Sequence, residues 1–242
     1  MNKSLIAAAA AISFVAVAAH AEDAPSPLTA NLSLTTNYKF RGQDQSKTPG
    51  NFKPAIQGGV DYTFGGGFYV GNWNSSIGWL NNSDKNANIE MDFYGGYKGE
   101  IVKDLGYDVG ILEYAYPGAS SANTTEIYGA LSYSIATLKY SHTVSKKYFG
   151  YIDARNTGYL DLAANYEVAK GLTLNGHVGY TRFPGSAKDN NGLVNYYDYR
   201  VGLTYDLGSG FSVAGAYVGA NKKDTYGDIN KGRAILTITK SM

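Results

Sequence analysis

Apolar and polar residues alternate along most of the chain from residue 28 onward. In the first stretch, Leu28, Leu32 and Leu34 occupy even positions, and polar residues occupy the odd positions between them. Side chains of a strand point to opposite faces in turn, so each such stretch predicts a strand with one apolar and one polar face. Twelve segments follow this pattern, clearly at 28–41, 55–64, 89–98, 126–135, 160–168 and 197–206 and more weakly at 68–78, 105–116, 136–145, 172–182, 211–220 and 233–242.

One weaker segment, 105–116, changes its phase in the middle. Apolar residues lie at odd positions up to Ile111 and at even positions from Leu112 onward. A β-bulge at this step would restore the alternation and keep Glu113 on the polar face. We therefore predict a bulge near Ile111 and Leu112.

The connections between the predicted strands alternate in length. Five are short, at 65–67, 99–104, 135–136, 169–171 and 208–210, and six are long and polar, at 42–51, 80–88, 117–124, 146–157, 183–195 and 221–232. Tight hairpins at one end, long loops at the other and about ten residues per strand are typical of an outer-membrane β-barrel.

The predicted fold class is all-β: a single closed antiparallel transmembrane β-barrel of about twelve strands. The short turns and both termini would lie in the periplasm, and the long loops would be extracellular. A polypeptide without a spanning helix crosses lipid only as a closed barrel, because every backbone N–H and C=O must be paired internally. The alternative is a soluble exported sandwich or lipocalin-like barrel, in which the apolar face would point inward.

The first 21 residues have the features of a secretory signal peptide. Lys3 supplies a positive charge, residues 5–19 form an apolar run, and Ala19-His20-Ala21 matches a cleavage site. The alternative is a retained N-terminal anchor. We predict export in a bacterium, cleavage after Ala21, a short periplasmic segment at 22–27 and an outer-membrane barrel at 28–242.

Composition narrows the function. The formal net charge is +1, and there are 22 Tyr, 30 Gly and no Cys. The near-zero charge argues against nucleic-acid binding. The lack of Cys excludes a disulfide framework, thiolate metal sites and a catalytic cysteine. Aromatic residues gather near the predicted strand ends, where membrane-interface girdles lie, and these are Tyr38, Tyr97, Tyr116, Tyr133, Tyr166, Tyr180, Tyr205 and Trp79.

Several motifs resemble the TorF family of proteobacterial outer-membrane porins. They are FRG at 40–42, PAIQGGVDY at 54–62, GFYVGNW at 67–73 and EMDFYGGYKG at 90–99, and the resemblance continues through YAYPG at 114–118 and EIYG at 126–129. The resemblance implies an outer-membrane channel, and it bears on fold and location more than on substrate. Such barrels usually end in an aromatic residue that the barrel insertion machinery reads, whereas this chain ends in Met242.

The polar face of the barrel would line its lumen. A charged residue facing lipid costs about 2–4 kcal/mol at the bilayer midplane for Arg or Lys, so the alternation assigns the charges to the interior. The predicted pore-lining residues are Lys39, Arg41, Asp61, Glu90, Asp92, Lys98, Glu126, Lys139, Asp161, Asp198 and Arg200. The same alternation adds Asp108, Glu167 and Asp206.

These charges predict a porin for passive diffusion of small polar solutes or ions. Acids outnumber bases on the predicted lumen face, which favours a weak cation preference. The alternative is that the charges pair with one another and brace a filled barrel. Twelve strands lie between the eight that leave an interior filled by side chains and the roughly sixteen that leave an aqueous channel.

An enzyme is the other class to weigh. An outer-membrane lipid hydrolase would need a Ser–His pair, but only His142 and His177 follow the predicted signal peptide, and no G-x-S-x-G motif is present. We predict no catalytic, cofactor or metal site. The expected partners are outer-membrane lipids and lipopolysaccharide, small solutes or ions, and the insertion machinery, but no nucleic acid. A non-conducting structural barrel is a further alternative.

Overall fold

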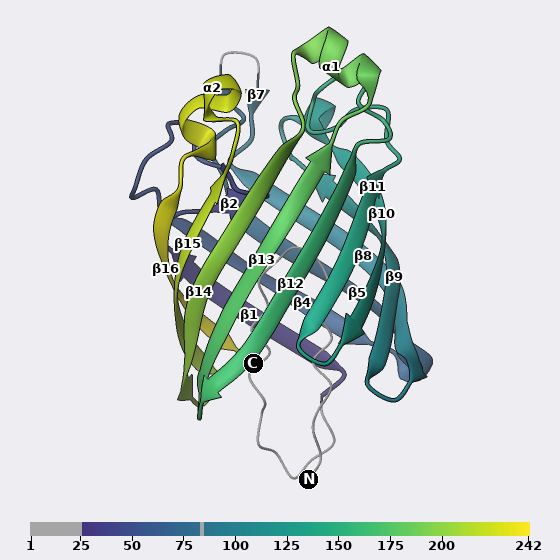
Figure 1. The fold of residues 1–242 in the computed structure, drawn as a ribbon, viewed down its shortest axis with the longest axis vertical. Coiled ribbons are helices and arrows are strands. Elements are labelled where there is room, and N and C mark those ends of the chain that lie inside the picture. Colours follow the sequence, from purple (N-terminus) through teal and green to yellow (C-terminus); the bar gives the residue numbers. More distant parts are fainter. Residues whose placement is uncertain (1–25, 83–84) are drawn as a thin grey trace.

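The structure, a computed structural model, describes residues 26–82 and 85–242. Within these residues, twelve strands form one closed antiparallel barrel (Figure 1). The strands are β1 Leu28–Thr35, β4 Ala55–Thr63, β5 Phe68–Ser76, β8 Ile89–Val102, β9 Leu105–Ala115, β10 Thr124–Tyr133, β11 Ala136–Thr143, β12 Gly158–Ala169, β13 Leu172–Arg182, β14 Tyr196–Gly208, β15 Phe211–Ala220 and β16 Arg233–Ser241. This confirms the predicted fold class. The predicted signal peptide, residues 1–21, lies outside the described residues.

The barrel closes where its first strand pairs with its last. The register of this pair runs from Asn31↔Ser241 to Thr35↔Thr237. All remaining pairs in the barrel are between strands that follow one another along the chain. Closure leaves no strand edge, so the backbone groups of every barrel strand have a partner on both sides.

Short turns and long loops lie at opposite ends of the barrel (Figure 1). One short turn contains the 3-10 helix η1 Gly65–Gly67. The long loops carry the remaining short elements, which are β2 Lys39–Phe40, β3 Gln43–Asp44, β6 Asn81–Asn82, β7 Lys85–Asn86, η2 Ser120–Ala122, α1 Gly185–Asn191, α2 Lys223–Tyr226 and η3 Gly227–Asn230. Over the described ranges, no helix has the length and apolar character needed to cross a membrane.

The apolar face of the strands points outward. On β12, Leu160 is 44% exposed and Leu162 is 54% exposed, whereas Thr204 on β14 is 2% exposed at the interior. A soluble sandwich or lipocalin-like barrel would bury these leucines and expose the polar residues. The outer surface therefore has the character of a surface that contacts lipid.

The first strand is shorter than predicted. β1 ends at Thr35, and the segment that follows forms the small hairpin β2–β3 between β1 and β4. Arg41 and Gly42 reverse the chain at its tip, with φ angles of 46° and 75°. A Cβ atom at Gly42 would lie 2.6 Å from the Gly219 carbonyl oxygen, so glycine permits the close approach of this hairpin to β15.

The predicted bulge in the segment 105–116 is wrong. β9 pairs without interruption from Tyr107 to Ala115 with β8 and throughout with β10. Ile111 is 51% exposed on the outer face, while Leu112 is 4% exposed and points inward. Glu113 consequently lies on the outer face, where its Oε2 accepts a hydrogen bond of 2.5 Å from the Thr125 hydroxyl. The interior takes apolar as well as polar side chains, so polarity alone misassigned this strand.

The aromatic girdle prediction also fails at three positions. Tyr116 is 2% exposed inside the barrel, and Tyr38 and Trp79 pack against the same interior cluster. Tyr133 and Tyr166, in contrast, are 64% and 57% exposed near the short turns. The aromatic residues at the long-loop end therefore fill the interior to a greater extent than the sequence indicated.

Two neighbouring positions on β12 test the orientation of the strands. We expect Leu162→Arg to impair folding into lipid, because an arginine facing the bilayer midplane costs about 2–4 kcal/mol. Ala163→Arg should be tolerated, since Ala163 faces the interior cavity. The measurement is the yield of SDS-resistant folded barrel after refolding into lipid vesicles. Equal yields for the two variants would show that β12 does not lie in lipid in this orientation.

Candidate functional site

The barrel encloses a cavity of about 250 Å³ that is lined by both polar and apolar side chains. The cavity runs from the level of the short turns, at Ser241 and Asn165, to Arg41 in the first long loop. Toward the short turns, the cavity is lined mainly by small polar side chains, which are Asn31, Ser33, Gln57, Thr137, Asn175, Thr204, Ser212, Thr237 and Thr239. Hydroxyl and amide groups exchange hydrogen bonds with water or a solute readily, so this cavity suits small polar molecules.

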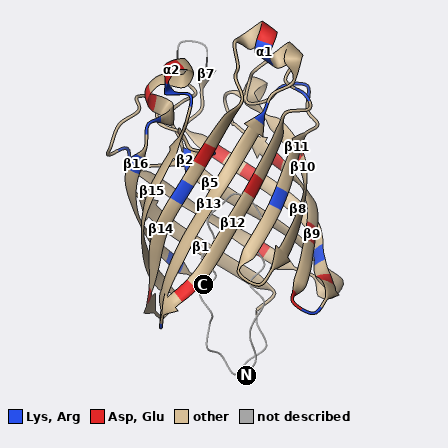
Figure 2. Ribbon diagram, in the orientation of Figure 1, with Lys and Arg blue, Asp and Glu red and all other residues tan. Residues whose placement is uncertain are grey.

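The predicted pore-lining charges on the strands all point to the interior, and Figure 2 shows such positions part-way along the barrel wall. Asp92, Lys139, Asp161 and Arg200 line the cavity, together with Lys39 and Arg41 from the first long loop. The others lie in the packed wall. Glu167 and Asp206 instead accept hydrogen bonds from backbone N–H groups within the short turns.

Several of the wall charges contact aromatic side chains. Asp61 accepts a hydrogen bond of 2.6 Å from the Tyr94 hydroxyl. The Lys98 ammonium lies 5.2 Å from the centroid of the Tyr69 ring, and the Lys139 ammonium lies 4.1 Å from that of Tyr128. Cation–π contacts of this kind stabilise a desolvated ammonium group. These charges therefore brace the wall as well as facing the lumen.

Arg41 connects the first long loop to β10 through an ion pair with Glu126. Its guanidinium donates two hydrogen bonds to the Glu126 carboxylate on β10, at 3.0 and 2.7 Å, and a third to the Tyr148 hydroxyl at 3.1 Å. The Arg41 and Glu126 side chains are only 1% and 2% exposed. The guanidinium carbon also lies 4.2 Å from the centroid of the Tyr159 ring. A bidentate buried pair of this kind is specific in geometry.

Aromatic rings close the barrel interior at the long-loop end. Phe149, from the loop between β11 and β12, lies 5.5 Å from Phe40 and 5.0 Å from Tyr114 between ring centroids. It contacts both interior aromatic clusters, one around Trp73 and Tyr116 and the other around Tyr196. We call Phe40, Arg41, Tyr148 and Phe149 the plug.

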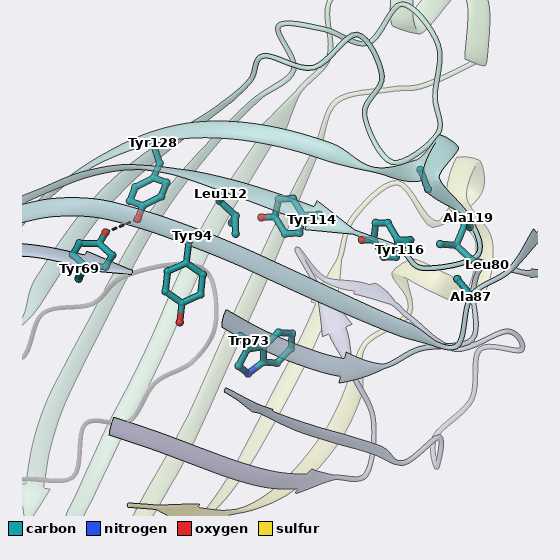
Figure 3. Close-up of a cluster of buried hydrophobic side chains, with 11 residues drawn as sticks. Tyr69, Trp73, Leu80, Ala87, Tyr94, Leu112, Tyr114, Tyr116, Ala119 and Tyr128 are labelled. Carbon is teal, nitrogen blue, oxygen red and sulfur yellow. Dashed lines mark hydrogen bonds between the residues drawn. The ribbon is translucent and has the colours of Figure 1, made fainter. Parts of the chain in front are cut away.

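The first of these clusters is built from strand side chains. Four aromatic side chains project into the interior here (Figure 3). They are Trp73 from β5, Tyr94 from β8, Tyr114 from β9 and Tyr116, which directly follows β9. Trp73 and Tyr114 line the cavity at its long-loop end, as do Phe40 and Arg41 of the plug.

A second group of charges connects β12, β13 and β14. The His177 Nδ1 lies 2.6 Å from Asp161 Oδ1, and its Nε2 lies 3.6 Å from Asp198 Oδ1. The Tyr159 hydroxyl also donates to Asp198, at 3.1 Å. His177 thus faces the interior, on the same side of the barrel wall as Asp161 and Asp198.

Lys39 fixes the base of the first long loop. Its ammonium donates hydrogen bonds to the backbone oxygens of Gly42 and Ile229, at 2.9 and 2.8 Å. Burial lowers the pKa of Lys39 to about 8, against the opposing effect of Asp44. Asp44 itself pairs with Arg233 of β16 at 3.2 Å. The loop is therefore held at its base as well as at its tip.

The remaining histidine, His142, lies near the end of β11. His142 contacts the Tyr140 hydroxyl at 3.1 Å and the Asn156 amide oxygen at 3.2 Å, and none of these contacts in the described chain is with a serine. No cluster of three or more potential metal ligands occurs among residues 26–82 and 85–242.

Sequence reasoning missed the plug and the inward aromatic side of β5 and β9. A signal was present, because Tyr114 has the same parity as Asp108 in one uninterrupted strand. Trp73 likewise lies opposite Asp92, so both must face inward. The plug residues Tyr148 and Phe149 had no such signal, since loops carry no periodicity. Phe40 followed the alternation of the segment 28–41, but β1 ends at Thr35 and Phe40 lies in the hairpin β2–β3.

The fold is that of outer-membrane porins. The KdgM porin aligns with a TM-score of 0.59 over 88% of this chain and 99% of its own, at 10% identity. A second structure of KdgM, in complex with disordered oligogalacturonate, gives 0.57 over 89% and 98%, also at 10% identity. The NanC porin gives 0.55 over 88% and 97%, at 10% identity.

The chain belongs to the Gcw_chp family, described as bacterial proteins of unknown function. The model of that family matches residues 19–241. No curated protein sequence matches the chain.

The Arg41–Glu126 pair offers a direct test of how the first long loop is held. Arg41→Ala removes one partner of a buried ion pair, a change that costs about 3–5 kcal/mol because the remaining charge stays buried and unpaired. We expect the backbone amides of residues 38–44 to exchange hydrogen at least about a hundredfold faster, measured by mass spectrometry on the folded barrel. Arg155→Ala, in an exposed loop position, is the control and should leave this exchange unchanged. Equal protection in both variants would show that Arg41 does not hold the loop.

Proposed function

We propose that the protein is an outer-membrane channel through which small polar solutes or ions diffuse passively. The observation that carries this proposal is a polar cavity inside a closed barrel whose outer face is apolar. The likeness to porin structures supports it, and the KdgM porin forms a complex with oligogalacturonate. A passive channel uses no catalytic residue, so the proposal is for a channel and not for an enzyme.

We further propose the orientation and partners that follow from such a role. The long loops would face the exterior, and the short turns and the C-terminus would face the periplasm. The exposed leucines and isoleucines of the outer face would contact outer-membrane lipids and lipopolysaccharide, and the insertion machinery would assemble the barrel after cleavage of residues 1–21. The resemblance to the TorF family supports the same role.

Passage through this barrel requires the plug to move. Arg41 lines the cavity and contacts Tyr148, and these two side chains are each about one-twentieth exposed or less. Both loops that supply the plug belong to the long-loop end, so their movement would leave the barrel strands intact. We propose that the plug closes the lumen at the long-loop end and that its movement produces a conducting state.

The weak cation preference is a further part of the proposal. Glu126 contributes little to it, since the Arg41 guanidinium neutralises its charge. The carboxylates that support it are Asp61, Glu90 and Asp92. Asp61 and Glu90 accept hydrogen bonds from tyrosine hydroxyls, and among the described residues Asp92 Oδ1 has no hydrogen-bond partner. Carboxylates that face a lumen attract cations into it.

Cell fractionation tests the proposed location in the outer membrane. We expect the protein to separate with outer membranes, and to migrate faster in SDS gels before boiling than after, because closed barrels resist SDS. Recovery as a freely soluble periplasmic protein with a single gel mobility would contradict the proposal.

Recordings in planar bilayers test both the channel and its plug. The wild-type barrel should show brief conducting events, and Arg41→Ala should raise the open fraction at least about tenfold, because loss of the buried pair weakens the closed state. In a salt gradient, the reversal potential should indicate a mild excess of cation over anion current.

Arg155→Ala is the matched control and should conduct as the wild type does. No conductance from either the wild type or Arg41→Ala, with SDS-resistant folding confirmed, would contradict the channel. A reversal potential of zero or of the opposite sign would contradict only the cation preference.

A further inference from the structure

The upper end of the cavity, which is the end near the long loops, has an acidic residue between two aromatic residues. Asp92 of β8 lies directly opposite Trp73 of β5 on one side and Tyr114 of β9 on the other. Residues directly opposite in an antiparallel pair have Cβ atoms about 4.5–5.5 Å apart. All three side chains point inward and line the cavity, and Figure 3 shows how Trp73 and Tyr114 project there.

The carboxylates of Glu90, Glu126 and Asp92 differ in their hydrogen-bond partners. Glu90 accepts hydrogen bonds of 2.6 Å from the Tyr38 and Tyr116 hydroxyls. Glu126 takes both hydrogen bonds of the Arg41 fork. Asp92 is 2% exposed, and among the described residues its Oδ1 has no hydrogen-bond partner. Asp108 and Asp198 also have one carboxylate oxygen without a partner, but each accepts a tyrosine hydrogen bond at its other oxygen. Of the three acids at this end of the cavity, Asp92 is the one whose Oδ1 the described residues leave without a hydrogen bond.

The electrostatic setting of Asp92 makes a cation the natural complement. Glu90 lies two positions away on the same buried face of β8, and the Arg41 guanidinium, which also lines this end of the cavity, is committed to Glu126. A buried carboxylate without a partner carries a large desolvation cost. A positively charged group at the adjoining cavity would relieve that cost, whereas an anion would add to it.

The surrounding rings define what kind of cation fits. Tyr38, Phe40, Trp73 and Tyr114 all line the cavity at this end, and the Tyr38 and Trp73 ring centroids are 5.7 Å apart. Aromatic rings attract organic ammonium groups through their π-systems, and Trp does so best. A small inorganic cation would have to exchange its water shell for these rings, which offer few oxygen ligands.

We propose that the upper end of the cavity is a binding site for small organic ammonium ions, with Asp92 as the counter-ion and Trp73 and Tyr114 as the flanking rings. The whole cavity has a volume of about 250 Å³, so its long-loop end takes only a compact ligand such as a quaternary ammonium or a short primary amine. That the ligand is also transported rests on the proposed channel function, whereas binding to the closed barrel does not.

Calorimetric titration of the purified, folded barrel in detergent tests the site, with choline chloride as the probe. We expect saturable binding, and we expect little binding of the neutral analogue of choline in which a tert-butyl group replaces trimethylammonium. Asp92→Asn should weaken choline binding about tenfold or more, since it removes the counter-charge but keeps the shape. Trp73→Leu should also weaken it severalfold.

Glu100→Gln is the matched control, because Glu100 lies on the same strand as Asp92 but is exposed beside a short turn. It should leave the dissociation constant unchanged. All variants must first show the SDS-resistant mobility of the folded barrel.

Three results would overturn the proposal: no choline binding to the folded wild type, equal binding of choline and its neutral analogue, or unchanged binding in Asp92→Asn. Displacement of choline by an equal concentration of potassium chloride would also overturn it, because the rings would then contribute nothing. Failure of choline binding in a barrel that conducts would reject this site alone, and binding to a barrel that does not conduct would reject the channel alone.

Discussion

The pairing of β1 with β16 is the constraint on which the rest of the structure depends. Once these strands pair, all twelve barrel strands have neighbours on both sides, and the outer face can be apolar without leaving a backbone edge unsatisfied. Closure also creates an inside, into which every second side chain must point. The polar residues that alternate with the lipid-facing leucines therefore share one enclosed space, whatever their chemistry.

The enclosed space is small, and its two halves are filled differently. Near the short turns, residues such as Ser33, Asn175 and Thr239 leave a polar cavity. Near the long loops, tyrosines, Trp73 and the plug fill the lumen, and two loops enter the barrel instead of standing above it. Twelve strands are compatible with both arrangements, so the size of the inward side chains decides between them.

Two buried charged groups underlie the proposed functions: the Arg41–Glu126 pair, which holds the plug, and Asp92, which forms the proposed cation site. Arg41 and Glu126 neutralise each other at the point where the first long loop meets β10, so one ion pair holds the plug. Asp92, a neighbour of that pair, has no such partner at its Oδ1 among the described residues. The same low-dielectric surroundings that strengthen the Arg41–Glu126 pair make Asp92 costly.

The sequence by itself determined the strand number, the long and short connections, and the inward direction of Asp61, Glu90, Asp92, Lys98, Lys139, Asp161, Asp198 and Arg200, because a period of two is a local property of an extended chain. It did not determine the direction of Leu112 and Tyr114, because an enclosed interior accepts apolar side chains and the alternation then loses its contrast. Nor did it reveal that Arg41 lies on a hairpin that reaches Glu126, 85 positions away. Contacts between loops and distant strands have no periodic signature, so only the closed tertiary structure decided that the lumen is plugged at one end and polar at the other.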